Sequence, residues 1–135
     1  IGNGAVELYY DDTKTIETEA NGIRITGHAG ANVTALSDGA TITVNFKEGT
    51  HFSVTLGGNR TFGDPGFTSA AIGSSGSIFI IQDGTGSRTA AFHSDYKFAG
   101  GTAPTLSTAA GSVDRLDYIV RASDNVHCVV TLDVK

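Results

Sequence analysis

The sequence lacks the features that define several large classes of protein. It holds a single cysteine, so it cannot form an internal disulfide, and its stability must come from a core or from partners. No apolar run approaches the roughly 20 residues of a membrane-spanning helix, so we expect no membrane insertion. Lys and Arg form no cluster and the formal net charge is −5, which argues against nucleic acid as a partner.

Methionine is also absent, and the sequence begins with isoleucine. We therefore expect it to be a piece of a longer chain, with any targeting segment outside it. Its 135 residues are enough for one ordinary domain with a short appendage. The lone Cys128 alternates with Val126 and Val130, which predicts a buried structural thiol.

What the sequence does contain is short apolar segments separated by glycine-rich turns. Four consecutive large apolar residues, 78–81, predict a central strand that is covered on both faces. The glycine-rich stretch 83–87 follows, and it predicts a β-hairpin spanning residues 77–92. Residues 60–71 are expected to be a loop with a short strand at Phe62.

Clean alternation on either side of this segment predicts further strands. Residues 41–46 and 51–56 are expected to form an antiparallel hairpin, and 113–121 pairs with 126–134 across a turn at 122–125. The side chains expected to face inward are Ile42, Val44, Phe46, Phe52, Val54, Leu56, Leu116, Tyr118 and Val120. Such spacing favours an all-β, antiparallel β-sandwich, a knob domain over residues 39–135.

The first 38 residues are predicted to be a separate β appendage with its connection. Three short strands within residues 5–27 are joined by turns at Asp11–Asp12 and Asn21–Gly22. These strands carry too few apolar residues to offset the entropy of ordering them, so we expect copies of the chain to complete their core. The predicted oligomer interface consists of Val6, Leu8, Tyr10, Ile16, Ile23 and Ile25.

No catalytic arrangement stands out, and we expect no enzyme and no cofactor. Residues 73–77 resemble a hydrolase nucleophile elbow but lack its last glycine and its helix. A polysaccharide depolymerase would need carboxylates that face each other across a groove. Asp114 and Asp117 are predicted to point to opposite faces of one strand.

No metal site is expected either. None of the four histidines, His28, His51, His93 and His127, has a second ligand at close spacing. Asp83 and Asp124 each stand in a turn sequence, where an aspartate that bonds its own backbone is a better interpretation than a calcium ligand.

One segment, residues 93–98, brings an imidazole, a carboxylate, an aromatic ring and an amine together. Sugars are bound by apolar faces with a few oriented polar groups, so the predicted ligand-binding residues are His93, Asp95, Tyr96 and Lys97. The alternative is an edge strand in which Tyr96 and Phe98 pack inward.

Several stretches resemble tail-fibre and related virion proteins of tailed bacteriophages. They are residues 4–18 with 21–23, then 76–84, 96–98, 100–106 and 117–118. The resemblance implies a homotrimer, with intertwined N-terminal strands around a common axis and the β-sandwich as a knob. It departs from the family at 93–96, where relatives often carry a tryptophan.

The resemblance also implies a function and a location. The chain is expected to be the distal part of a fibre in the virion that attaches to host cell-surface polysaccharide and contacts other virion proteins. The alternative is a purely structural module, such as a spacer, a capsid decoration or a collar fibre that holds three chains in register.

Overall fold

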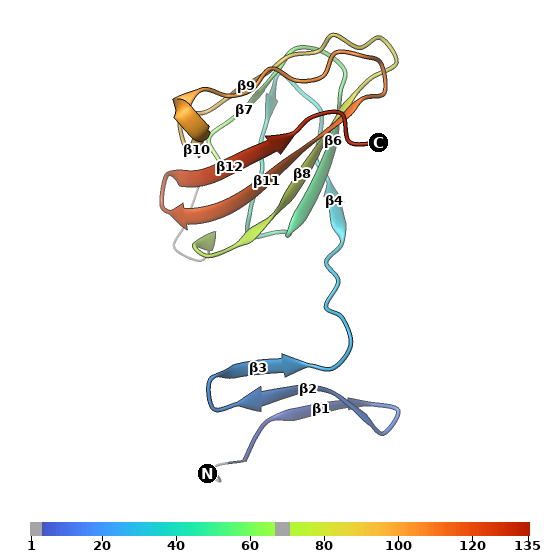
Figure 1. Ribbon diagram of the computed structural model, residues 1–135, viewed down its shortest axis with the longest axis vertical. Coiled ribbons are helices and arrows are strands. Elements are labelled where there is room, and N and C mark those ends of the chain that lie inside the picture. Colours follow the sequence, from blue (N-terminus) through green and yellow to red (C-terminus); the bar gives the residue numbers. More distant parts are fainter. Residues whose placement is uncertain (1–3, 67–70) are drawn as a thin grey trace. The chain divides into compact units, whose positions relative to one another are not determined.

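A computed structural model describes residues 4–66 and 71–135 (Figure 1). The chain divides into two compact units, an N-terminal unit of residues 1–30 and a C-terminal unit of residues 31–135. The sequence placed the boundary eight residues later, after residue 38. Residues 67–70, part of the predicted loop 60–71, lie outside the described residues.

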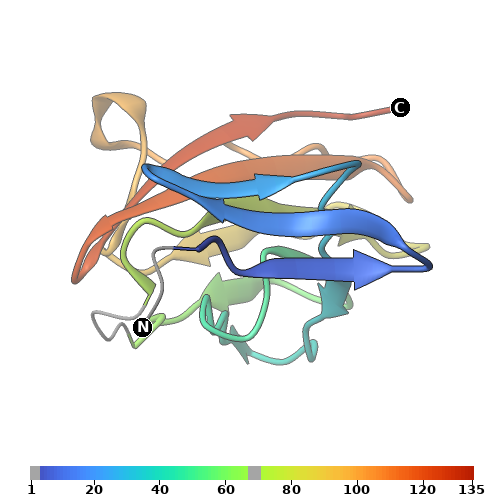
Figure 2. The same cartoon turned by 90° about the horizontal axis from the view of Figure 1, so that it is seen from below.

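The N-terminal unit is a three-stranded antiparallel sheet, seen as the blue strands of Figure 2. Its strands are β1 (Glu7–Tyr10), β2 (Thr13–Glu19) and β3 (Gly22–Ile25). Asp11 and Asp12 both have positive φ, 49° and 56°, as the type I′ turn of a tight hairpin requires. The second turn uses Ala20 and Asn21, so Gly22 already belongs to β3. The predicted three-stranded arrangement is confirmed.

The C-terminal unit contains two sheets. The larger sheet has the order β10-β12-β11-β8-β6-β4 (Figure 1). The smaller sheet has the order β5-β7-β9. The strands are β4 (Val33–Ala35), β5 (Thr41–Ile42), β6 (His51–Leu56), β7 (Arg60–Phe62), β8 (Ser75–Gln82), β9 (Ala90–Phe92), β10 (Tyr96–Lys97), β11 (Val113–Ala122) and β12 (Asn125–Thr131). A short 3₁₀ turn, η2 (Ala99–Gly101), follows β10. The all-β class is confirmed.

From β4 to β9 the chain alternates between the two sheets, so strands that are neighbours within a sheet run parallel. The predicted hairpins over 41–56 and 77–92 are therefore wrong. In each case the chain crosses to the other sheet between the two strands, so they lie on opposite sides of the core and share no backbone hydrogen bonds. Alternation fixes which side of a strand is apolar and does not fix its pairing partner. The strand directions are consequently mixed rather than antiparallel throughout.

The antiparallel part of the larger sheet is β8-β11-β12. The predicted hairpin of β11 and β12 is confirmed, with Asp124 in the left-handed region at its turn (φ 55°). β8 lies between β6 and β11, as expected of a central strand. β10 adds to β12 in parallel, which places Lys97 beside His127.

The core lies between the two sheets of the C-terminal unit. Every side chain predicted from alternation to face inward is buried, from Ile42 to Val120. An aromatic cluster joins the layers. Phe62 stacks on Phe92 of the same smaller sheet at 4.9 Å and meets Tyr96 of the larger sheet edge to face at 6.4 Å. Cys128 is 5% exposed, and burial raises the pKa of its thiol to about 12, which confirms the predicted structural role. No helix in the described part of the chain is long and apolar enough to cross a membrane.

Candidate functional site

The predicted ligand-binding residues lie in the tight connection that follows β9 and in β10 itself, which consists of Tyr96 and Lys97. The amide of His93 donates to the carbonyl of Phe62, and the amide of Tyr96 donates to the carbonyl of His93. The carbonyl of Asp95 accepts from the amide of Val126. Backbone bonds therefore hold this connection against both sheets.

Two of the four predicted side chains point into the protein. Tyr96 is 4% exposed and its ring meets Phe92 edge to face at 5.6 Å. Burial raises the pKa of Tyr96, and the charges of Cys128, Asp95 and Asp64 add to that rise. Its hydroxyl has no hydrogen-bond partner among the described residues. Asp95 is also buried, whereas His93 is half-buried.

Lys97 is exposed and takes part in two shallow grooves. The first, the loop groove, has a volume of about 470 Å³ and runs along the β9–β10 connection toward η2. Its walls include Phe92, His93, Ser94, Lys97, Phe98 and Ala103. The ammonium of Lys97 donates to the carbonyl of Ser94, so the charge is held at the rim.

The second groove, the sheet groove, has a volume of about 520 Å³ and lies over β10, β12 and β11. Its walls include Lys97, Phe98, Asp117, Ile119, His127 and Val129. The register places Lys97 beside His127 and His127 beside Ile119, in one row across three strands. Sequence reasoning missed this groove, since its polar groups come from three separate segments.

The polar groups of the sheet groove stand above an apolar floor. Ile119 and Val129 are 49% and 67% exposed, so a broad apolar surface faces solvent here. Asp117 accepts a hydrogen bond from Ser77 at 2.6 Å and is paired with Arg115 at 3.0 Å, which fixes the carboxylate. An apolar floor with a few fixed polar groups is typical of a ligand-binding surface.

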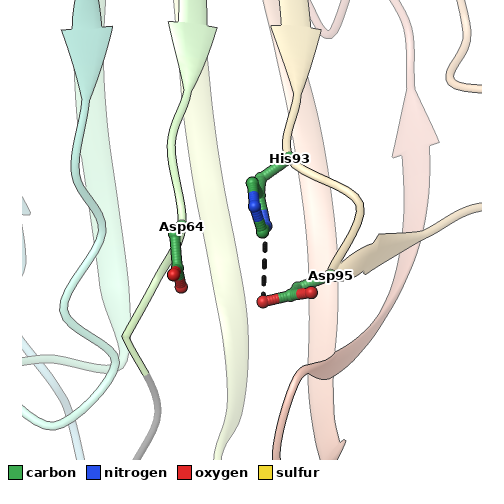
Figure 3. Close-up of side chains that lie close together, drawn as sticks. All are labelled: Asp64, His93 and Asp95. Carbon is green, nitrogen blue, oxygen red and sulfur yellow. Dashed lines mark ion pairs between the residues drawn. The ribbon is translucent and has the colours of Figure 1, made fainter.

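A third feature is a cluster of Asp64, His93 and Asp95 (Figure 3). One ligand atom from each side chain lies within 4.8 Å of the others. His93 Nδ1 is 3.3 Å from an Asp95 carboxylate oxygen, and Asp64 stands beside this pair at the end of the neighbouring strand. The sequence did not predict this cluster.

The residues predicted to form the oligomer interface lie on one face of the N-terminal sheet. Leu8 pairs with Ile16, and Ile16 pairs with Ile25, so the three side chains share that face. Tyr10 of β1 and Ile23 of β3 follow at even spacing on the same strands, and Val6 directly precedes β1. Ile16 is half-buried, and the other five are between 44% and 79% exposed. This apolar face is therefore not covered by the other described residues of the N-terminal unit.

The opposite face of the same sheet carries ion pairs. Lys14 bonds to Glu17 at 2.6 Å and to Glu7 at 2.9 Å, and both bonds raise the pKa of the lysine. Arg24 pairs with Glu19, and the hydroxyl of Tyr9 donates to Glu7. The N-terminal sheet is thus amphipathic, with one charged and one apolar face.

Two aspartates singled out in the sequence have structural roles. Asp83 Oδ1 accepts from the amides of Thr85 and Gly86, and Oδ2 pairs with Arg88 at 2.7 Å. These bonds, led by that from Arg88, lower the pKa of Asp83 to about 2. Asp114 is buried and accepts from the amides of Ser107 and Asp133. Asp83 is therefore a turn-former, as predicted.

These observations define a two-sheet, all-β domain with shallow surface grooves. Residues 41–121, more than half of the chain, match the family described as "Putative phage tail fibre C-terminal domain". The chain belongs to this family, and it is part of a bacteriophage fibre protein, as the resemblance predicted. No curated protein and no solved structure matches it.

Proposed function

We propose that the C-terminal unit attaches the fibre to glycans on the surface of the host bacterium. The observation that carries this proposal is the sheet groove, where Lys97, His127 and Asp117 stand around an apolar floor. Sugars present apolar C–H faces flanked by hydroxyls, and acidic sugars add carboxylates that a lysine can pair with. The loop groove shares Lys97 and extends the surface available to a chain of sugars.

The unit acts by binding and not by cleaving. Glycoside hydrolysis requires two carboxyl groups that flank one bond. Asp114 is buried inside the unit and Asp117 lies at the sheet groove, so these two cannot act on the same glycosidic bond. Asp117 is further held by Arg115 and Ser77.

A binding assay on polysaccharide purified from the host tests the role of the groove. The double variant Lys97→Ala, His127→Ala removes the cation and the imidazole, and we expect binding to fall by about tenfold or more, the effect of roughly 1.4 kcal/mol. The matched control is Lys47→Ala, His28→Ala, which removes the same side-chain types at exposed positions outside the groove. Equal binding by the two double variants would refute the sheet groove as the binding site.

We further propose that the chain assembles as a homotrimer through the apolar face of the N-terminal sheet. A three-stranded sheet with one open apolar face lacks the second layer that sheets need for independent stability. Copies of the same face, arranged around a three-fold axis, would supply that layer. Three weak glycan sites on one particle would also raise the overall avidity.

Light scattering on the chain in solution tests the assembly. We expect a mass three times the 13.9 kDa of one chain. Replacing Leu8 and Ile23 with serine removes two exposed apolar contacts and should shift the mass toward that of one chain, whereas Tyr9→Ser on the charged face should not. A well-folded wild-type monomer at micromolar concentration would overturn the trimer.

The second candidate function is a purely structural module that holds the chains in register. The amphipathic N-terminal sheet favours it, because register is what a shared apolar face would fix. A chain that forms trimers but fails to bind host polysaccharide, while the phage itself adsorbs, would support this function over attachment.

A further inference from the structure

The parallel pairing of β7 and β9 brings three potential metal ligands to one edge of the smaller sheet. Phe62 pairs with Phe92, so the residues that follow each strand emerge side by side. Asp64 follows β7, and His93 and Asp95 follow β9. Because backbone bonds anchor both His93 and Asp95, the edge is rigid where the ligands leave it.

The side-chain atoms are already near coordinating distance. One oxygen or nitrogen from each of the three residues lies within 4.8 Å of the others. Ligands that bind one ion at about 2.0–2.2 Å lie about 3 to 4.4 Å from one another. Small side-chain rotations are therefore enough to close the site.

The charge of the cluster is not balanced by the protein. Asp38, Asp83 and Asp117 each pair with an arginine. In the described residues 4–66 and 71–135, Asp64 and Asp95 have no lysine or arginine within 4.0 Å, and Asp95 has only His93 beside it. Two carboxylates held together in this way attract a cation.

Two polar atoms, one from His93 and one from Tyr96, have no hydrogen bond among the described residues. His93 Nδ1 is buried, and its 3.3 Å approach to Asp95 lacks the alignment of a hydrogen bond. Tyr96 is 4% exposed, and its hydroxyl has no hydrogen-bond partner among the described residues. Burial, and then the charges of Cys128, Asp95 and Asp64, raise the pKa of this hydroxyl. Buried polar atoms are normally hydrogen-bonded, so these two are available to contact a bound ligand.

We propose that Asp64, His93 and Asp95 bind a divalent first-row transition ion of the Zn²⁺ or Mn²⁺ type, with Tyr96 donating a hydrogen bond to a carboxylate ligand or to water on the ion. One imidazole nitrogen with two carboxylate oxygens is a donor set suited to these ions. Ca²⁺ takes six to eight oxygen ligands and is poorly served by it. The metal proposal does not rest on the glycan proposal, although His93 also lines the loop groove.

The bound ion would fasten the end of β7 to the β9–β10 connection. Asp64 is exposed and His93 is half-buried, so solvent reaches the ion and completes its coordination. The residues immediately after Gly66 lie outside the described part, and the site uses none of them.

Calorimetric titration of ZnCl₂ and MnCl₂ into the full chain, after treatment with a chelator, tests the site. We expect one ion per chain. Co²⁺ in place of Zn²⁺ should give visible d–d absorption that reports the nitrogen and oxygen ligands. Thermal unfolding should occur at a higher temperature with the ion than without it.

Asp64→Asn and His93→Ala should each lower the affinity for the ion by about tenfold or more, since even residues that only hydrogen-bond to metal ligands contribute that much. The exposed Asp64→Asn keeps the fold, so it remains informative if His93→Ala unfolds. The matched controls are Asp12→Asn and His28→Ala, an exposed aspartate and an exposed histidine in the N-terminal unit. Absence of binding by the wild-type chain, or wild-type affinity in Asp64→Asn, would overturn the proposal.

Discussion

The two units of this chain are both built from short strands, but they differ in what those strands bury. No residue of the described part of the N-terminal unit, residues 4–30, is buried. Several strands of the C-terminal unit bury their inward-facing side chains, among them Phe52, Ile78 and Leu116. The difference is a second layer, which teaches that an amphipathic strand pattern specifies a face and not a core.

Of the changes that test this difference between the two units, removal of an aromatic ring from the core of the C-terminal unit should have the largest effect on stability. Phe62→Ala removes a fully buried side chain that stacks on Phe92, and we expect the free energy of unfolding to fall by about 3 to 5 kcal/mol. Tyr9→Ala, at a 58% exposed position on the charged face of the N-terminal sheet, should change it by less than about 0.5 kcal/mol.

Urea unfolding followed by circular dichroism measures both variants. Similar losses in Phe62→Ala and Tyr9→Ala would break the comparison, because they would mean that the N-terminal sheet is as tightly packed in a single chain as the sandwich.

A close backbone approach should give the next largest effect. A Cβ atom at Gly76 of β8 would lie 1.7 Å from the carbonyl oxygen of Thr50, which also accepts the hydroxyl of Tyr118. Gly76→Ala must therefore push β8 away from the backbone of Thr50, just before β6, and we expect this to lower the free energy of unfolding by about 1 to 3 kcal/mol. Gly84→Ala is the control, since nothing lies within 4 Å of its added atom. If Gly76→Ala and Gly84→Ala unfolded at the same urea concentration, this close packing at Gly76 would be contradicted.

The smallest effect concerns stability in acid. Arg88 and the amides of Gly86 and Thr85 lower the pKa of Asp83 to about 2 from a usual value near 3.8. A lowered pKa in the folded state stabilises the fold above the unfolded value, and this contribution is lost as the pH falls from about 4 to about 2.

Asp83→Asn should therefore flatten the acid limb of a stability–pH curve over that range. Asp12→Asn, in a turn of the N-terminal unit whose left-handed conformation asparagine also tolerates, should leave the limb unchanged. An acid limb that Asp83→Asn does not alter would show that the turn contributes nothing to acid stability.

Much of the fold could be predicted where the pattern is local. The strands of the N-terminal unit follow from two turn sequences, and the hairpin of β11 and β12 follows from alternation on both sides of Asp124. The inward faces of β6 and β11 were also correct, because a period of two fixes which side of a strand is apolar.

The partner of each strand could not be read in the same way. The alternation around the buried Ile42 is the same whether β5 pairs with β6 in a hairpin or, as here, with β7. The cluster of Asp64 with His93 and the row from Lys97 to Ile119 depend on parallel pairings between distant segments. No local signal in the sequence marks those pairings.

The central place of β8 has a consequence for how the protein is made. On the ribosome, β8 emerges with β6 already available on one side, but its other edge stays open until β11 has been synthesised. An uncovered strand edge is a template for pairing with other nascent chains. Pairing of β11 with β8 therefore covers an edge that could otherwise pair with other nascent chains during synthesis.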